Sequence, residues 1–340
     1  MKKRRIAVLL SVVFVILLAF SGCGRTGEKR IVRIGHNQST NHPTHLALVA
    51  FRDYINEQLG DKYVVEVYPN ELIGSQTDMV QLTQTGAIDF CVASNAILET
   101  FSKNYEIFNL PYLFASTESY HNAMDDSKIT GPIFSATEKA GFRAVTWLDA
   151  GTRNFYTLNK PINSPADLKG LKIRVQQSPT NIEMMKLLGG SATPMGFGEV
   201  YTALQSNIID GAENNEMALV DNGHGDVCKY YSYDMHQMVP DILIANQAFL
   251  QELSEGEQAV FQEGYKLINQ TQRTEWVEAV EKAKKKAVDE QGVQFVYPDQ
   301  EPFKTACLPL HEKVLKNNKE IQPIYDLIQK YNEKYPSESE

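Results

Sequence analysis

The chain has 340 residues, of which 43% are hydrophobic and 22% are charged, so it is long and apolar enough to fold as roughly two globular domains. Its 42 acidic residues outnumber its 33 basic residues, which gives a net charge of −9. An acidic surface of this kind repels phosphate backbones and anionic lipid headgroups, and therefore disfavours nucleic-acid binding.

The N-terminus carries the pattern of a secretory signal peptide. Basic residues at positions 2–5 precede a mostly apolar stretch over residues 6–20, which is too short for a good membrane-spanning helix. A small pair and Cys23 follow, and this sequence is similar to the bacterial lipobox, in which the cysteine is diacylated and becomes the first residue of the mature protein. We therefore predict a lipoprotein signal peptide over residues 1–22 and a linker over residues 23–30, with lipid on Cys23.

Two alternatives to the lipid anchor stay open. They are a plain signal peptide with an incidental cysteine, and an uncleaved anchor. In either of the cleaved forms, the remaining chain has 29 basic and 42 acidic residues, a net charge of −13, because the removed segment carries four cations and no carboxylate side chain. All three forms place the rest of the protein outside the cytoplasm.

Short β-branched segments alternate with helical segments from residue 31 onward, which indicates α/β sheets. The predicted strands and helices of the first half are, in order, residues 32–35, 44–59, 63–68, 77–85 and 88–92. The first of these helices opens with His42-Pro43, and proline suits a first helical position because its missing N–H would have no partner there.

The second half of the chain repeats this arrangement. Its predicted strands and helices are residues 144–148, 154–157, 171–175, 178–188, 197–204 and 208–212. In both halves a helix closes on a residue that tolerates the left-handed conformation, Gly86 or Asn207, and an Ile-Asp pair opens a strand two residues later. The repeat predicts two similar α/β lobes, with coincidence in a common local motif as the alternative.

One long helix interrupts the pattern. Ser254 and Glu257 have the spacing of a capping box, and no proline follows until Pro298. Apolar residues keep one face over nearly ten turns, about 55 Å at about 1.5 Å per residue. This length exceeds one small lobe, so we predict a helix that lies across both lobes. Two collinear helices with a break near residues 269–271 are the alternative.

The common catalytic motifs are missing from the sequence, which has no GxGxxG, P-loop, GxSxG or HExxH pattern. His36, His42 and His45 lie close together, but no carboxylate or cysteine stands at ligand spacing, so we predict neither a metal site nor a cofactor. Glu213 and Glu216 could act as an acid/base pair. Because they lack a partner nucleophile, we expect them to be solvated loop carboxylates.

The cysteines other than Cys23 do not form a recognisable framework. Cys91, Cys228 and Cys307 show no CxxC pattern and no Cys/His zinc spacing. At most one disulfide could form among them. We predict that they are small buried residues.

Two arginines lie where a carboxylate-binding site could form. In the predicted strand over residues 171–175 the apolar residues alternate inward, which puts Lys172 and Arg174 on the other face. Arg153 stands between two further predicted strands. The planar guanidinium group matches a carboxylate with two parallel hydrogen bonds. An exposed strand arginine is, however, more often a solvated charge, so neither residue decides the matter alone.

Several motifs stand in a consistent order along the chain. They are LKIRV at residues 171–175, ATPMGFGEVYTALQ at 192–205, IDGAEN at 209–214, GS at 74–75, GAIDF at 86–90 and NLPY at 109–112. Together they resemble the DctP family, the solute-binding proteins of tripartite ATP-independent periplasmic (TRAP) transporters. The resemblance covers about residues 31 to 325.

The resemblance implies an α/β fold of two lobes, like that of periplasmic binding proteins, with hinge strands and a long helix that spans both lobes. With the elements above, it predicts lobe I over residues 31–150 and 241–280 and lobe II over residues 151–240 and 281–330. A polar tail follows over residues 331–340.

The resemblance also implies which residues bind the ligand. It assigns Arg174 the bidentate pair with a ligand carboxylate and Arg153 an assisting role. Asn214 is expected to be a hydrogen-bond partner, and Phe197 the aromatic residue that packs on the ligand. The further residues that it places in the cleft are Asn37, Ser94, Gln177 and Asn215, the last at a position where the family often has proline.

The predicted function is the capture of an organic acid by a monomer without catalytic activity, and its delivery to the TRAP membrane permease. Ser94 replaces the acidic residue of sialic-acid binders, so sialic acid is not expected. The neutral Asn, Gln and Ser set suits a hydroxyl-rich uronate better than a bare dicarboxylate, which would favour a further cation. The alternatives are a C4-dicarboxylate or other carboxylate ligand, a secreted sugar-acid hydrolase or lyase, and a receptor lipoprotein for signalling.

Overall fold

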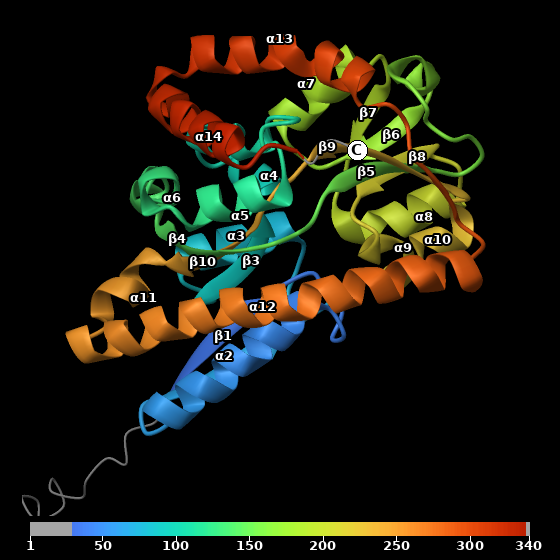
Figure 1. Ribbon diagram of the computed structural model, residues 1–340. Coiled ribbons are helices and arrows are strands. Elements are labelled where there is room, and N and C mark those ends of the chain that lie inside the picture. The colour runs from blue at the N-terminus through green and yellow to red at the C-terminus, as the bar shows by residue number, and fades with distance from the viewer. Residues whose placement is uncertain (1–28, 338–340) are drawn as a thin grey trace, which may run out of the picture.

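The computed structural model describes residues 29–337, which form a mixed α/β fold with two sheets (Figure 1). The predicted signal peptide over residues 1–22 and the predicted lipidation site Cys23 lie outside the described residues. Across residues 29–337, none of the helices combines the length and the apolar character that crossing a bilayer requires.

The first sheet has five strands in the order β2-β1-β3-β10-β4. The strands are β1 (Arg30–Gly35), β2 (Tyr63–Tyr68), β3 (Phe90–Ser94), β4 (Phe142–Leu148) and β10 (Asp241–Asn246). β1 runs parallel to β2 and β3, whereas β10 runs antiparallel to β3 and β4. We call this sheet and the helices on it lobe I.

The second sheet has six strands in the order β11-β9-β5-β8-β6-β7. The strands are β5 (Arg153–Thr157), β6 (Lys172–Val175), β7 (Ser191–Pro194), β8 (Gly211–Asn214), β9 (Tyr230–Gln237) and β11 (Gln294–Val296). We call this sheet and its helices lobe II. The chain passes from lobe I to lobe II between β4 and β5 and returns between β9 and β10, and these two short segments form the hinge. It crosses to lobe II again through the long helix that precedes β11. The residue boundaries given above for the lobes stay a prediction.

Helices cover both sheets. They are α2 (Pro43–Leu59), α3 (Gln76–Thr85), α4 (Asn95–Leu98), α5 (Thr117–Asp125), α6 (Ser127–Phe134), α7 (Pro179–Leu187), α8 (Val200–Gln205), α9 (Met217–Asp221), α10 (His224–Val227), α11 (Gln247–Glu252), α12 (Glu255–Asp289), α13 (Glu301–Asn317) and α14 (Gln322–Lys334), with short 3₁₀ turns η1 (Lys103–Asn109), η2 (Glu138–Ala140), η3 (Pro165–Leu168), η4 (Phe197–Glu199) and η5 (Lys319–Ile321). The helix predicted over residues 197–204 is therefore a 3₁₀ turn followed by α8.

The predicted long helix is confirmed. α12 is one continuous helix of 35 residues, so the alternative with a break near residues 269–271 is wrong. It begins with the predicted capping box, in which the Glu257 carboxylate accepts the backbone N–H of Ser254 at 2.8 Å. α12 packs against α2 of lobe I and α9 of lobe II, and Figure 1 shows it running across both lobes.

The internal repeat is also present. Gly86 and Asn207 both adopt the left-handed conformation, with φ of 76° and 55°. The strands that follow them, β3 and β8, both pair in parallel with an earlier strand of their own sheet. In both lobes, a residue in the left-handed conformation therefore forms the turn between a helix and an inner strand.

The Ile-Asp pairs do not open these strands, contrary to the prediction. β3 begins one residue after Asp89, and β8 begins one residue after Asp210. The reason is that each carboxylate accepts a backbone N–H of the neighbouring strand, from Arg33 at 2.9 Å and from Lys172 at 2.7 Å. The aspartate thus ends the turn and fixes the start of the pairing.

The three cysteines of the described chain, Cys91, Cys228 and Cys307, are free thiols. All are buried, with at most 1% of the residue exposed. The prediction of small buried residues is confirmed, and their burial raises the pKa of each thiol to about 12.

Gln272, near the middle of α12, holds the first hinge segment. Its amide donates to the backbone oxygen of Asp149 at 2.6 Å and accepts the backbone N–H of the same residue at 3.1 Å. Gln272 is fully buried, so the amide satisfies two main-chain groups that water does not reach.

We expect Gln272→Ala to lower the free energy of unfolding by about 1–3 kcal/mol, because it leaves two buried backbone groups without partners. Differential scanning calorimetry measures the effect as a lower Tm. Gln270→Ala is the matched control, since Gln270 lies on the exposed side of the same helix. Equal melting temperatures for the two variants would contradict the role given to Gln272.

Candidate functional site

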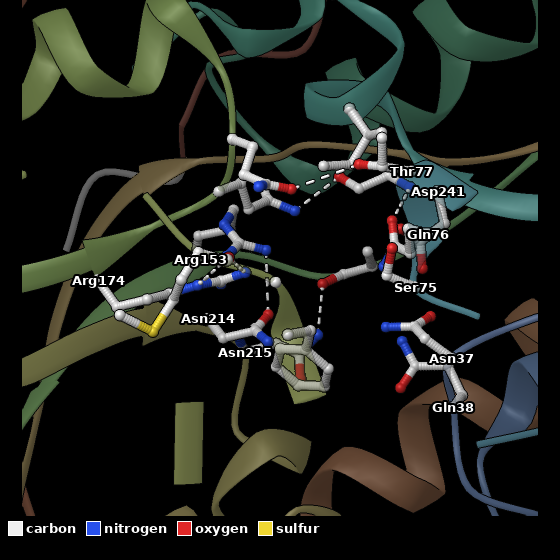
Figure 2. Close-up of a pocket in the computed structure, with 18 residues that line it drawn as sticks. Asn37, Gln38, Ser75, Gln76, Thr77, Arg153, Arg174, Asn214, Asn215 and Asp241 are labelled. Carbon is white, nitrogen blue, oxygen red and sulfur yellow. Dashed lines mark hydrogen bonds between the residues drawn. The ribbon is translucent and has the colours of Figure 1, made fainter. Parts of the chain in front are cut away.

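A cavity lies between the two lobes, and both lobes contribute to its wall (Figure 2). The structure places in its lining all the residues that the sequence analysis put in a ligand site, namely Arg174, Arg153, Asn214, Phe197, Asn37, Gln177, Ser94 and Asn215. They come from strands and loops far apart in the sequence, which the fold brings together at the hinge side of the two sheets.

Arg174 projects from β6, an inner strand of lobe II, and only 3% of it is exposed. Its Nε and Nη2 atoms donate to the backbone oxygen of Met195 at 3.2 and 2.9 Å, and its guanidinium carbon lies 5.7 Å from the centre of the Phe197 ring. Burial lowers the pKa of Arg174. Among the described residues, no carboxylate forms an ion pair with it.

The alternative that Arg174 is a solvated surface charge is therefore wrong. The side chain is buried at the cavity wall, against Met195 and Phe197 of the same lobe. A buried cation with no carboxylate in contact is costly, so an anion in the cavity would relieve that cost. The bonds to Met195 occupy Nε and one hydrogen of Nη2, which leaves Nη1 and the other Nη2 hydrogen for a ligand.

Arg153, at the start of β5, is held differently. Its Nε forms an ion pair with the buried carboxylate of Glu213, its Nη1 donates to Asn214 Oδ1 at 3.0 Å, and its Nη2 donates to the Glu213 backbone oxygen at 2.7 Å. These bonds use three of its five N–H groups. The charge of Arg153 is thus already balanced, and its remaining N–H groups can assist in binding without leaving an unpaired cation.

The ion pair behind Arg153 extends into a buried chain of four alternating charges. Glu213 Oε2 lies 3.6 Å from His236 Nε2, and His236 Nδ1 lies 2.8 Å from Asp234 Oδ2. Burial alone would lower the pKa of His236, but Asp234 and Glu213 more than offset it and raise that pKa to about 9. Burial alone would raise the pKa of Glu213, but Arg153 and His236 lower it to about 2.

Glu213 and Glu216 are not solvated loop carboxylates, so that expectation is wrong. Glu213 lies on β8 and is fully buried, while Glu216 is 6% exposed and accepts the Tyr233 hydroxyl at 2.7 Å. The sequence could not show this, because the cation and the hydroxyl that make their burial possible come from other segments. Neither glutamate lines the cavity.

Two neighbouring asparagines complete this side of the cavity. Asn214 Oδ1 accepts from Arg153 and from the backbone N–H of Asn215 at 2.9 Å, which turns its NH₂ group toward other partners. The Asn215 amide donates to the backbone oxygen of Ala150 at 2.9 Å and accepts the Met217 N–H at 3.1 Å. Asn215 therefore ties the cavity wall to the hinge, and Asn214 is the one with free donors.

The remaining predicted residues lie on the walls. Phe197 sits in the turn η4 between two glycines, and its ring lies beside the Arg174 guanidinium. Asn37, in the loop after β1, is 7% exposed, and its Oδ1 is buried without a hydrogen-bond partner among the described residues. This unsatisfied oxygen can accept a hydroxyl group.

Contacts between the lobes close the cavity. Gln176 of lobe II donates to Ser94 Oγ of lobe I at 2.8 Å, and Thr77 of lobe I donates to Gln177 Oε1 of lobe II at 3.3 Å. Ser94 and Gln177 thus line the cavity and also join its two walls. The structure therefore has the lobes in contact around the site.

Glu99 strengthens this closed arrangement. It belongs to lobe I and is 8% exposed, and its Oε1 accepts both the backbone N–H of Thr180 at 3.1 Å and the Thr180 hydroxyl at 2.8 Å. The same carboxylate also accepts the hydroxyl of Ser178, the N-cap of α7. A lobe I carboxylate therefore sits at the N-terminus of a lobe II helix, where negative charge is favourable.

The histidines form a hydrogen-bonded group rather than an open ligand set. His36 Nδ1 accepts the backbone N–H of Gln38 at 3.1 Å, so the proton is on Nε2, which donates to His45 Nδ1 at 3.0 Å. His42 Nδ1 accepts the Thr44 N–H as the helix cap. Burial lowers the pKa of His36 and of His42 to about 3. Residues 29–337 contain no group of three or more side chains placed to hold a metal ion.

Sequence reasoning missed several residues of the lining, namely Gln38, Ser75, Gln76, Thr77, Gln176 and Asp241. Ser75 carries a signal, because it caps α3 through a capping box with Asp78. Asp241 also carries one, since a single acid directly before the apolar run of β10 indicates a carboxylate at a strand end. The three glutamines, Gln38, Gln76 and Gln176, have no local sequence signal that distinguishes them from surface residues.

Comparisons with known proteins identify the family. The DctP model, described as a bacterial extracellular solute-binding protein of family 7, matches residues 34–318. The chain belongs to this family, as the resemblance of its motifs indicated. An uncharacterised relative from Salmonella typhimurium is 37% identical and aligns over 97% of this chain and 99% of its own.

Solved structures resemble the whole fold. A TRAP solute-binding protein of Anaerococcus prevotii with bound α/β-D-glucuronate is 68% identical, with a TM-score of 0.90 over 91% of this chain and all of its own. A TRAP solute-binding protein of a Sulfitobacter species with bound β-D-galacturonate is 30% identical, with a TM-score of 0.85 over 88% of this chain and all of its own. The predicted two-lobe fold with a long spanning helix is confirmed.

The buried charge chain makes the stability of the protein depend on pH. The pKa of His236 is raised by folding, so its contribution is complete below about 6.5 and is lost as the pH rises through about 9. We expect His236→Gln to melt at a lower temperature than the wild type at pH 6, and this difference to shrink by pH 10. Thermal denaturation across this pH range measures it, and a difference that stays constant would contradict the assignment of a charged His236.

Proposed function

We propose that the protein captures a uronate, such as D-glucuronate or D-galacturonate, in the cavity between its lobes and delivers it to the membrane permease of a TRAP transporter. The observation that carries this proposal is Arg174, a buried cation at the cavity wall without a carboxylate partner among the described residues. The uronates bound to the similar structures support the same ligand class.

The ligand carboxylate pairs with Arg174 through Nη1 and the free hydrogen of Nη2, which is the fork geometry that carboxylates accept. Each charge-assisted bond contributes about 1.5–3 kcal/mol. Asn214 donates to a sugar oxygen, Asn37 accepts a hydroxyl, and Phe197 covers an apolar face of the ring. The ring hydroxyls therefore meet a neutral polar wall, while the carboxylate meets the cation.

Ligand capture is coupled to closure of the lobes. A ligand held by Arg174 and Asn214 of lobe II and by Asn37 of lobe I binds the closed form more tightly than the open form, and so shifts the population toward closure. The contacts of Glu99 and Ser94 across the lobes form only in that closed arrangement. The permease then meets a surface made from both lobes.

A secreted hydrolase or lyase finds less support. Its candidate acid and base, Glu213 and Glu216, do not line the cavity, and their carboxylates are engaged with Arg153 and Tyr233. We infer that the protein binds its ligand without making or breaking a bond. No specific feature of the described chain favours a receptor for signalling over transport.

The protein is proposed to be held at the outer face of the cell membrane by lipid on Cys23, as a monomer. We expect Cys23→Ser to remove the protein from the detergent phase in a phase-partition assay, because two acyl chains anchor a protein stably whereas none does not. Replacing the buried thiol of Cys91 by Ser is the matched control and leaves partition unchanged. Detergent partition that persists in the Cys23 variant would contradict lipidation at this residue.

The ligand site is tested by calorimetry with D-glucuronate. Arg174→Ala should weaken binding by about 100-fold or more, because two charge-assisted hydrogen bonds are lost. Lys172→Ala, an exposed residue two positions earlier on the same strand, is the control and keeps wild-type affinity. If Arg174→Ala disturbs folding, Arg174→Lys keeps the charge and tests the fork alone. Binding by these Arg174 variants within threefold of the wild type would refute the proposed site.

A further inference from the structure

Asp241 is the acidic residue of the cavity lining. It is the first residue of β10 and pairs through its backbone with Ser94 of β3 and with Leu148 of β4. A position between two strands of the lobe I sheet, with 8% of the residue exposed, holds its carboxylate rigidly at the cavity wall.

The carboxylate of Asp241 has no cation of its own. Within the described residues, none of the ion pairs involves it. Burial raises its pKa to about 6, Arg153 and Gln38 oppose this increase, and the nearby charge of Asp149 adds to it. At neutral pH the group is therefore mainly ionised, and it can accept hydrogen bonds in addition to the one that the Gln38 side chain donates.

Asp241 and Arg174 lie on opposite sides of the cavity in Figure 2, one from lobe I and one from lobe II. Arg153, the other cation of the lining, is already balanced by Glu213. Within the described residues, the cavity therefore has a cation without an ion-pair partner at one side and a carboxylate without an ion-pair partner at the other. A ligand complementary to this arrangement has a carboxylate at one end and hydroxyl donors at the other.

We propose that Asp241 determines specificity, by accepting the hydroxyl groups at the far end of a sugar acid and by repelling ligands that carry a second carboxylate there. This inference rests on the proposed binding of a uronate through Arg174. Two carboxylates in contact in a desolvated site cannot both stay ionised without a large cost. Aldarates and extended dicarboxylates are thus disfavoured by charge, although their first carboxylate suits Arg174 as well as that of a uronate does.

D-Gluconate and D-glucarate provide the sharpest pair of ligands. Both are open-chain six-carbon acids, and they differ only in whether the far end is a hydroxymethyl group or a carboxylate. We expect calorimetry at pH 7.5 to show that the wild type prefers D-gluconate by at least about tenfold. Asp241→Asn keeps the shape and removes the charge, so it should lower this preference about tenfold and also weaken binding of D-glucuronate.

Asp61→Asn is the control, because it removes an exposed lobe I carboxylate outside the cavity and should leave the preference unchanged. If Asp241→Asn does not fold, Asp241→Ser tests the same loss of charge. A preference within twofold of the wild type in the Asp241 variants, while D-glucuronate still binds the wild type, would overturn the role of Asp241 and leave the proposed function standing. If the wild type binds none of these acids, both proposals fail.

Discussion

The structure depends on one energetic constraint, the burial of the Arg174 guanidinium without a carboxylate partner. A desolvated cation is stabilised only where something else supplies charge or hydrogen bonds, and here the Met195 backbone oxygen and the face of the Phe197 ring supply part of this. The free side of the guanidinium faces the cavity. Part of the free-energy cost of burying Arg174 is therefore offset when an anionic ligand binds between the lobes.

The other charged residues of the site leave Arg174 as the cation that is available to a ligand carboxylate. Arg153 is neutralised by the chain through Glu213, His236 and Asp234, so the second arginine adds donors without adding net charge. Burial of this chain is possible because each charge has an opposite neighbour. Contacts across the lobes then enclose the ligand. Gln272 of α12 holds the hinge segment in place through its two hydrogen bonds to the backbone of Asp149. Binding, closure and hinge stability are linked through a few buried polar groups.

Sequence patterns predicted the lobes, the long helix and the eight cavity residues because these depend on periodicity, capping spacing and ordered family motifs. The environment of those residues could not be predicted in the same way. The pattern around Arg174 is typical of a solvated charge, and that around Glu213 of a loop carboxylate. The residues that bury Arg174 and the cation that pairs with Glu213 come from other segments of the chain, so the local pattern does not show them. The position of Asp241 before the apolar run of β10 indicates a carboxylate at a strand end, but it does not show that Arg174 lies on the opposite wall of the cavity.

The central claim is that a ligand carboxylate completes the hydrogen bonding of Arg174. A crystal structure of the protein with D-glucuronate tests this most directly. The account predicts both carboxylate oxygens within hydrogen-bond distance, about 2.7–2.9 Å, of the Nη1 and Nη2 atoms of Arg174, between two lobes in contact. A sugar acid bound with its carboxylate away from Arg174, or bound outside the cavity, would contradict it.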